Sequence, residues 1–361
     1  MKIMTFLLIS LALFSCEPDA PKPAGKPSNL NTQLTITNGE VHVLATADSA
    51  NFYTVTFYDN NDTVTVETQD GEAVHVFNTS GTYQIRTRAH TTQASYIEKT
   101  EQVLIEISTG NTGAPTSGYI SPLTYPNYTL VWQDEFNGAS LSSDWTYDLG
   151  TGSWGWGNNE LQYYKQENAV VTDGILTITA KNENFNTSNY TSSRLKTQGL
   201  KSWKYGRIDV RAALPYGQGI WPAIWMLGDN ITSAGWPACG EIDIMELIGG
   251  AGANDRTIHG TVHWSNAGTH AQYGGSKSLT SGKFADNFHV FSIVWDANSI
   301  HWLLDNVEYH SVDTSPAELD EFREKFFIIL NVAVGGNWPG SPDASTIFPQ
   351  KMYVDYVRVF Q

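Results

Sequence analysis

The sequence predicts an all-β protein with two domains. Short segments in which hydrophobic and polar residues alternate recur along most of the chain, and Gly, Asn, Asp and Ser separate them, as in antiparallel sheets. A helical period is nearly absent, and only residues 316–325 are predicted to form one short helix. The length of 361 residues exceeds what one small domain needs. We therefore expect two β-sandwiches joined by a linker.

Residues 1–16 are predicted to be an export signal. Lys2 supplies a positive charge, and the apolar run that follows over 6–14 is too short to span a bilayer. The run ends in Leu-Phe-Ser-Cys, which resembles a bacterial lipobox, in which the cysteine, here Cys16, is acylated and becomes the mature N-terminus. We expect an exported protein, lipid-anchored at the cell envelope and exposed on a bacterial outer membrane. Plain secretion with a free thiol is the alternative. Residues 17–30 then form a flexible tether.

Residues 31–108 are predicted to form the first and smaller sandwich. Alternating runs such as 53–57 are separated by turn residues. His-Val-Phe at 75–77 and Ser-Gly-Thr-Tyr at 80–83 resemble the PKD-like domains of immunoglobulin type. Because no cluster of titratable residues suggests chemistry, we interpret this domain as a spacer, with ligand binding as the alternative. A linker rich in Gly, Ser, Thr and Pro follows over 109–124.

Residues 125–361 are predicted to form the larger sandwich. Its segments alternate with period two, and an Asp-Ala-Asn turn leads from one of them into a return strand. Many strands in about 235 residues suit a two-sheet sandwich or jelly roll. The clearest predicted strands are 175–180, 207–211, 291–295, 300–304 and 353–359.

The charge balance excludes one class of partner and disfavours another. Lys and Arg total 21 against 37 Asp and Glu, which gives a net charge of −16. Nucleic acid needs a basic face, which the sequence does not offer, and the negative field would repel an anionic polysaccharide. A neutral ligand fits better, and 12 Trp and 17 Tyr offer rings for a core or for stacking. Cys239 is a lone thiol, which we interpret as a small packed residue.

The segment 240–247 carries the candidate chemistry. Apolar residues alternate with carboxylates there, which predicts a strand with Glu241 and Asp243 on one face. Glu246 would point to the opposite face of a regular strand. One extra residue in a β-bulge, most simply Met245, returns it to the same face. Three carboxylates would then converge on one surface.

Converging carboxyl groups are useful to a glycosidase. Like charges a few ångströms apart raise one another's pKa, so one group stays protonated near neutral pH while another is ionised. A glycosidase that retains configuration needs such a pair, about 5–5.5 Å apart: one attacks the anomeric carbon, and the other protonates the leaving oxygen and then activates water. A third carboxylate between them can orient the nucleophile. The alternative interpretation is a solvated polar face on an edge strand.

The segment 240–247 resembles the signature of glycoside hydrolase family 16. Further stretches resemble the same family in the same order and extend the resemblance over about 125–361, namely 131–138, 158–164, 205–207, 219–227, 259–263 and 330–340. The resemblance implies a concanavalin-like jelly roll with a glycan cleft across its concave face. It also implies Glu241 as nucleophile, Asp243 as its helper and Glu246 as general acid/base.

Within that family, the extra Met245 and the stretch 235–240 resemble the laminarinase branch. This implies an endo-acting, retaining β-glucanase that cuts β-1,3-glucan (laminarin) and mixed-linkage β-1,3/1,4-glucan. A neutral β-glucan agrees with the negative charge of the protein. Two alternatives stay open: a non-catalytic glucan-binding surface protein, and a family 16 hydrolase acting on another polysaccharide such as agarose. We expect a monomer with no nucleic-acid partner.

The same resemblance supplies substrate-binding positions. Aromatic rings stack on sugar faces, and amide, carboxylate and guanidinium groups hydrogen-bond sugar hydroxyls; core packing is the alternative for the rings. The implied residues are Asn158, Glu160, Arg194, Trp221, Trp225, Trp236, His263 and Trp338.

A structural calcium ion is also implied by the resemblance, on the convex face away from the cleft. The matching positions are Glu135, Gly174 and Asp355. Carboxylate and carbonyl oxygens suit Ca²⁺. A purely structural Asp355 is the alternative, and no cofactor is required for the chemistry.

Overall fold

A computed structural model describes residues 25–37, 39–59, 62–77, 79, 81–105, 113–252 and 254–361. The chain divides into two compact units: the second takes in residue 105 onward with the short segments 36–41 and 76–81, and the first takes in the others. The predicted signal peptide and its Cys16 lie outside the described residues, so both stay predictions. No helix in the described part of the chain is long and apolar enough to cross a membrane.

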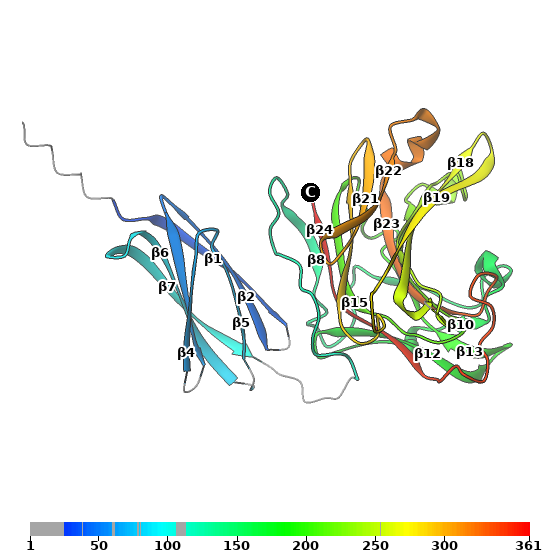
Figure 1. Cartoon of the computed structure of the whole chain (residues 1–361), viewed down its shortest axis with the longest axis horizontal. Helices are drawn as coiled ribbons and strands as arrows, with labels where there is room; N and C mark the ends of the chain where they lie inside the picture. Colours follow the sequence, from blue (N-terminus) through cyan, green and yellow to red (C-terminus); the bar gives the residue numbers. More distant parts are fainter. Residues whose placement is uncertain are drawn as a thin grey trace, which may run out of the picture. The chain divides into compact units, whose positions relative to one another are not determined.

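The N-terminal region forms two small sheets (Figure 1). Its strands are β1 (Ser28–Thr37), β2 (Glu40–Asp48), β3 (Phe52–Asp59), β4 (Asp62–Thr68), β5 (Glu72–Val76), β6 (Gly81–Thr92) and β7 (Ser95–Ile105). One sheet has the order β1-β2-β5 and the other β4-β3-β6-β7. Ala45 of the first sheet packs with Tyr53 and Ala89 of the second, so the two sheets share a core. The predicted tether over 17–30 is corrected at its end, because strand β1 already begins at Ser28.

The second unit is an all-β sandwich with a few short helical turns. Its elements are β8 (Leu130–Asp134), β9 (Thr146–Asp148), η1 (Gly155–Asn159), β10 (Gln162–Tyr164), η2 (Gln166–Asn168), β11 (Ala169–Thr172), β12 (Ile175–Phe185), β13 (Ser188–Ser192), β14 (Arg194–Lys196), β15 (Gly206–Ala213), β16 (Ile220–Gly228), α1 (Ile231–Ala234), β17 (Glu241–Glu246), η3 (Asn254–Arg256), β18 (Thr257–Asn266), β19 (Thr269–Ser278), β20 (His289–Trp295), β21 (Ser299–Leu304), β22 (Val307–Asp313), η4 (Ala317–Arg323), β23 (Phe326–Val334) and β24 (Gln350–Phe360).

Two sheets build this unit. One has seven strands in the order β19-β18-β17-β16-β23-β14-β9; the other has ten, along β10-β13-β12-β24-β15-β20-β21-β22, with β11 beside β12 and β8 beside β24. Ile224, Ile242 and Val262 of the seven-stranded sheet meet Ile208 and Val357 of the ten-stranded sheet in one core. Alternate residues of each strand therefore face this core, which is the sandwich that the period-two pattern predicts.

Strand β15 is buried on both faces. Val210 faces the core between the sheets. On the opposite face, Nε of Arg211 donates a hydrogen bond of 2.6 Å to the carbonyl of Tyr119, and the hydroxyl of Tyr125 donates one of 2.7 Å to Asp209. The chain around residues 119–125 thus covers the outer face of this strand.

This covering segment corrects the linker predicted over 109–124. Ser121 is buried, and its backbone N–H donates a hydrogen bond of 2.8 Å to the hydroxyl of Tyr356. The backbone N–H of Tyr119 donates one of 3.1 Å to the carbonyl of Phe288. The composition suggests a free linker, but these contacts make residues 117–121 part of the second unit.

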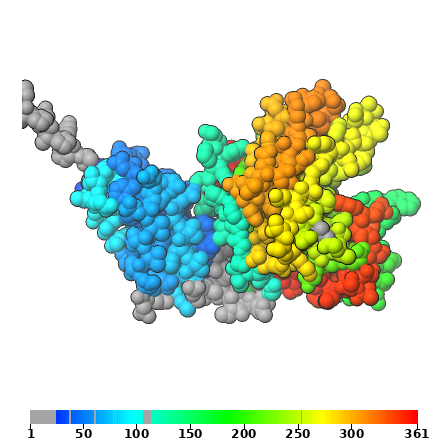
Figure 2. All heavy atoms as spheres, viewed as in Figure 1, coloured from blue at the N-terminus to red at the C-terminus, as the bar shows by residue number. Residues whose placement is uncertain are grey.

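Strands β18, β19 and β22 lie side by side on one side of the second unit. β18 pairs with β19 along their whole length, and β19 lies beside β22. Their atoms, yellow to orange in Figure 2, form a continuous face. The short helix predicted over 316–325 is the 3-10 helix η4, which contacts β18.

Candidate active site

A cleft of about 950 Å³ lies on the face of the seven-stranded sheet that is turned away from the core. Strand β16 shows why: Ile224 and Met226 enter the core, while Trp221 and Trp225 line the cleft. The cleft brings together every residue predicted to be catalytic or substrate-binding, namely Asn158, Glu160, Arg194, Trp221, Trp225, Trp236, Glu241, Asp243, Glu246, His263 and Trp338.

A β-bulge places the three carboxylates on one face of β17. Opposite β18, Asp243 pairs with Thr261 and Glu246 with His259, so three steps along β17 match two along β18. Opposite β16, the register passes from Asp243 directly to Met245, which leaves Ile244 as the residue without a partner. The predicted bulge is therefore present, but against β16 the extra residue is Ile244 rather than Met245.

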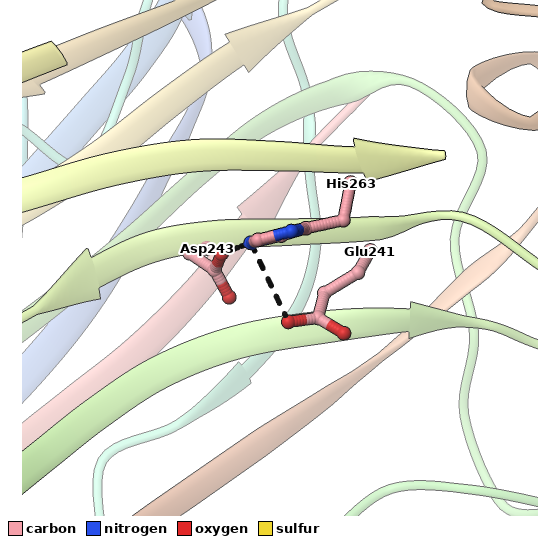
Figure 3. A group of neighbouring side chains, drawn as sticks. All are labelled: Glu241, Asp243 and His263. Atoms are coloured by element: carbon pink, nitrogen blue, oxygen red, sulfur yellow. Dashed lines mark hydrogen bonds and ion pairs between the residues drawn. The ribbon is translucent and has the colours of Figure 1, made fainter. Parts of the chain in front are cut away.

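The carboxyl groups are held by neighbouring side chains (Figure 3). Nε2 of His263 lies 3.0 Å from Oδ2 of Asp243 and 3.9 Å from Oε1 of Glu241. The indole of Trp236 donates a hydrogen bond of 2.7 Å to Oε2 of Glu241. On the core side of β17, the indole of the buried Trp302 donates a hydrogen bond of 2.7 Å to the backbone carbonyl of Asp243.

Burial raises the pKa of all three carboxyl groups. Burial and then the charge of Asp243 raise the pKa of Glu241 to about 8, and burial raises the pKa of Asp243 to about 7. The pKa of Glu246 is raised well above its usual value, first by burial and then by Asp243 and Glu241. All three groups therefore hold a proton to a higher pH than exposed carboxyl groups do.

The raised pKa values and the hydrogen bonds of the three carboxyl groups suit two chemical roles. A protonated Glu246 can give its proton to a leaving oxygen. A hydrogen bond between Glu241 and Asp243 raises the pKa of Glu241 and lowers that of Asp243. The indole of Trp236 donates to Glu241 and lowers its pKa, which favours the anion that a nucleophile needs. The site can therefore present an acid and a nucleophile on one strand.

Arg194 is clamped between two tryptophans at one end of the cleft. Its guanidinium carbon lies 4.7 Å from the ring centroid of Trp156 and 4.7 Å from that of Trp225. Nε of Arg194 forms an ion pair of 3.0 Å with Asp148 of β9, the neighbouring strand of the sheet. The cation is thus fixed in direction before any ligand arrives.

A hydrogen-bond chain connects this end of the cleft to β23. The indole of Trp225 donates to Asn331 at 2.7 Å, the amide of Asn331 donates to the hydroxyl of Tyr164 at 3.1 Å, and that hydroxyl donates to Glu160 at 3.1 Å. Burial raises the pKa of Glu160. The predicted residue Asn158 also reaches Glu160, at 3.4 Å. These groups form a preorganised polar floor.

The loop before β10, residues 154–160, carries two further tryptophans next to these polar groups. Trp154 and Trp156 both have a positive φ, and Trp154 is 86% exposed. Gly155 lies between them with a φ of 57°, and a Cβ there would lie 2.5 Å from the backbone nitrogen of Glu160. Only glycine suits that position. The rings are therefore carried on a closely packed turn.

Further aromatic rings line the cleft beside Glu246. The indole of Trp221 donates a hydrogen bond of 3.0 Å to Oε1 of Glu246. The ring of Trp338 meets Trp221 edge-on at 5.8 Å and His259 at 5.0 Å, and it is 43% exposed. Rings in such a cleft offer flat apolar faces to a sugar.

The cleft residues that the sequence did not single out include Trp156, His259, His270 and Asn331. His259 and Asn331 lie inside stretches that carry the family resemblance, so the signal was available. Trp156 stands two residues before another such stretch. His270 lies outside all of them, and only the pairing of β18 with β19 brings it to the site.

The sequence profile of the glycosyl hydrolases family 16 matches residues 157–358, more than half of the chain. The chain belongs to glycosyl hydrolase family 16. A relative of this family 16 chain is the β-glucanase of Rhodothermus marinus, which is 44% identical over an alignment of 256 positions. That alignment covers 65% of this chain and 86% of the relative. The clotting factor G alpha subunit of Tachypleus tridentatus is 46% identical over 239 residues, again 65% of this chain. The family 16 chain spans 34% of the length of that subunit.

A solved structure agrees with the fold of this family 16 chain. The catalytic domain of the endo-1,3-β-glucanase (laminarinase) from Thermotoga petrophila RKU-1 superposes with a TM-score of 0.61 at 45% identity. The match covers 65% of this chain and 98% of that domain. The N-terminal β region lies outside the family match, so its PKD-like kinship stays a prediction.

The calcium site implied for this family 16 chain does not fit the donors present. Both carboxylate oxygens of Glu135 accept hydrogen bonds from Arg358, at 2.7 and 2.9 Å. Oδ2 of Asp355 accepts one of 2.6 Å from Arg211. The arginines neutralise the two acids that a calcium ion would need, and Gly174 supplies at most a backbone carbonyl.

Proposed function

We propose that this chain is an endo-acting, retaining β-glucanase that hydrolyses β-1,3-glucan and mixed-linkage β-1,3/1,4-glucan. The observation that carries the proposal is the bulge in β17, which keeps Glu241, Asp243 and Glu246 on one cleft. A sheet without it would send Glu246 into the core. The names of the relatives, a β-glucanase and a laminarinase, support the substrate class.

The proposed reaction is a double displacement. Glu241 attacks the anomeric carbon while Glu246 transfers its proton to the leaving glycosidic oxygen, so the C–O bond breaks as the glycosyl–enzyme ester forms. Glu246 then takes a proton from water, whose oxygen attacks the same carbon and releases Glu241. Asp243, beside Glu241 on the same face of β17, orients the nucleophile, and the donor from Trp236 favours its ionised form.

The charge of the cleft supports a neutral substrate. Among the described residues that line it, Arg194 is the cation and four are carboxylic acids, Glu160, Glu241, Asp243 and Glu246. Such a site repels sulfate or uronate groups. The exposed rings of Trp236 and Trp338 suit the apolar faces of glucosyl units.

A non-catalytic glucan-binding protein is the rival function, because one relative, from Penaeus monodon, is named as a β-1,3-glucan-binding protein. A protein that only binds glucan needs the aromatic rings and the hydrogen-bonding groups of the cleft, but it does not need the three carboxyl groups of β17. Three buried acids of raised pKa cost stability in a protein that only binds. The retained trio therefore favours hydrolysis.

The decisive experiment compares the full chain with Glu241→Gln on laminarin, barley β-glucan, agarose and carrageenan. We expect the unchanged chain to release oligosaccharides from the first two only. Glu241→Gln should lower turnover by about 10⁴-fold or more while laminarin binding persists, since the amide cannot form the ester. Glu308→Gln, on β22 outside the cleft, is the matched control and should keep full turnover. Turnover retained by Glu241→Gln would remove that residue from its role.

Location and assembly are further parts of the proposal. We propose that the protein is exported, acylated at Cys16 and displayed as a monomer at the cell envelope, with the N-terminal β region as a spacer. The lipobox-like run at 13–16 supports the anchor. Metabolic labelling with a fatty acid should mark the full chain and not Cys16→Ser; equal labelling of both contradicts the anchor. Light scattering should give the mass of one chain.

A further inference from the structure

A second histidine lies directly behind His263. Nε2 of His270, on β19, lies 2.9 Å from Nδ1 of His263, and the two rings are stacked with centroids 5.1 Å apart. The other nitrogen of His263, Nε2, lies 3.0 Å from Oδ2 of Asp243. A continuous hydrogen-bonded chain therefore runs from Asp243 through His263 to His270, which is exposed.

The chemistry of imidazole restricts where the hydrogens of this chain can lie. A neutral ring has one N–H and one lone pair, and a protonated ring has two N–H groups. Two ring nitrogens at 2.9 Å need one hydrogen between them. If His263 is neutral and donates through Nε2 to Asp243, its Nδ1 is an acceptor, and His270 must donate. If His263 is protonated at both nitrogens, His270 must accept instead.

Three features favour His270 as the donor. Burial and the neighbouring His263 both lower the pKa of His270, so this ring is neutral at neutral pH. The ring of Trp236 packs against it at 4.7 Å, which fixes its plane. Oδ2 of Asp243 lies 3.0 Å from Nε2 of His263 and accepts from its N–H, which leaves Nδ1 of a neutral His263 as an acceptor.

We propose that His270 is a positioning residue: by donating its Nε2–H to His263, it holds His263 as the neutral tautomer that donates to Asp243, and it thereby sets the pH range in which Glu241 works. This rests on the proposed roles of Glu241 and Asp243. His270 acts through His263 and lies one ring away from Asp243.

Other titratable groups surround the pair and contribute to its charge balance. They are Glu241, Asp243 and Glu246 on β17, His259 on the same face of β18, Cys239 before β17, and Glu321 of η4, whose Oε1 accepts a hydrogen bond of 3.1 Å from the backbone of Ser265. None of them changes in the variants below, so differences between variants report on position 270.

Two substitutions at position 270 separate a donor from an acceptor. In His270→Gln the amide can still donate to Nδ1 of His263. In His270→Glu the carboxylate can only accept, which requires a hydrogen on Nδ1 and favours the doubly protonated ring. The positive charge then lies nearer to Asp243 than the new negative charge does, so it lowers the pKa of the carboxyl trio.

The kinetic test follows the pH dependence of kcat/KM on laminarin for the full chain. We expect His270→Gln to keep both midpoints of the profile. His270→Glu should move both midpoints to lower pH by about half a unit or more, with about a three- to tenfold loss at the original optimum. Gln272→Ala, a cleft-lining change on the same strand, should alter KM without moving the midpoints. Equal profiles for His270→Gln and His270→Glu would overturn the proposal.

A second readout does not depend on activity. Nitrogen-15 NMR of the histidine-labelled full chain distinguishes the two neutral tautomers from the protonated ring. We expect His263 to carry its hydrogen on Nε2 at pH 7–8 in the unchanged chain and in His270→Gln, and to be doubly protonated in His270→Glu. A hydrogen on Nδ1 of His263 in the unchanged chain would overturn the proposal. If no glucan is cleaved but the Nε2 tautomer is found, the proposed function fails while the tautomer assignment stands.

Discussion

The indole nitrogen of Trp221 donates a hydrogen bond of 3.0 Å to Oε1 of Glu246. The two residues lie on neighbouring strands, β16 and β17, whose register is shifted by the bulge. The bond favours the ionised carboxylate and therefore lowers the pKa of Glu246, against burial and the charges of Asp243 and Glu241, which raise it. One side chain thus moderates how tightly the proposed acid holds its proton.

Replacing Trp221 with Phe should therefore shift the basic limb of the pH profile upward. Without the donor, the pKa of Glu246 rises, so the protonated acid persists to higher pH, by about one unit. Activity at neutral pH should fall about tenfold, because a less acidic group transfers its proton more slowly. The measurement is kcat/KM on laminarin between pH 5 and 10. An unmoved basic limb in Trp221→Phe would contradict the role of this bond.

The clamped guanidinium of Arg194 leads to a second prediction. Arg194→Lys keeps the charge but loses the flat group that lies between Trp156 and Trp225. We expect kcat/KM on laminarin to fall about tenfold, mainly through a higher KM. The control is Lys196→Gln, which removes the other ion pair of Asp148 but does not line the cleft, and should stay within about twofold. Equal losses in both variants would mean that Asp148, not the clamp, matters.

The buried Trp302 should support the bulge from inside the sandwich. Trp302→Phe removes the donor to the buried carbonyl of Asp243. We expect the free energy of unfolding of this unit to fall by about 1–3 kcal/mol, followed by denaturant and tryptophan fluorescence. Trp154→Phe, at a residue that is 86% exposed, should change it by less than about 0.5 kcal/mol. A loss no larger than that control would show that the bond contributes nothing.

The arginine-paired acids on the far sheet make a prediction about metal. Because Arg358 holds both oxygens of Glu135 and Arg211 holds Asp355, calcium or EDTA should leave the melting temperature unchanged. Arg358→Met should instead destabilise the unit by about 3–5 kcal/mol, because it leaves Glu135 buried without its cation. A rise of several degrees on adding calcium to the unchanged chain would restore the predicted metal site.

Much of the fold was predictable because strand patterns are local. Alternation of apolar and polar residues in segments such as 175–180 or 291–295 reports which face of a strand meets a core, and the structure has strands β12 and β20 there. The composition of residues 117–121 predicted a linker wrongly, because composition is also a local property. Their burial depends on contacts with Tyr356 and Phe288, more than 160 residues away in the sequence.

The sequence by itself determined the two sandwiches, the family resemblance and the three carboxylates 241, 243 and 246, since these follow from residue type and short spacing. Only the tertiary structure decided which residue is extra in the bulge, that Arg194 lies between two tryptophans, and that His270 backs His263. Those relationships depend on the register between paired strands. Register is set by turns and by packing over the whole sheet, and no single segment encodes it.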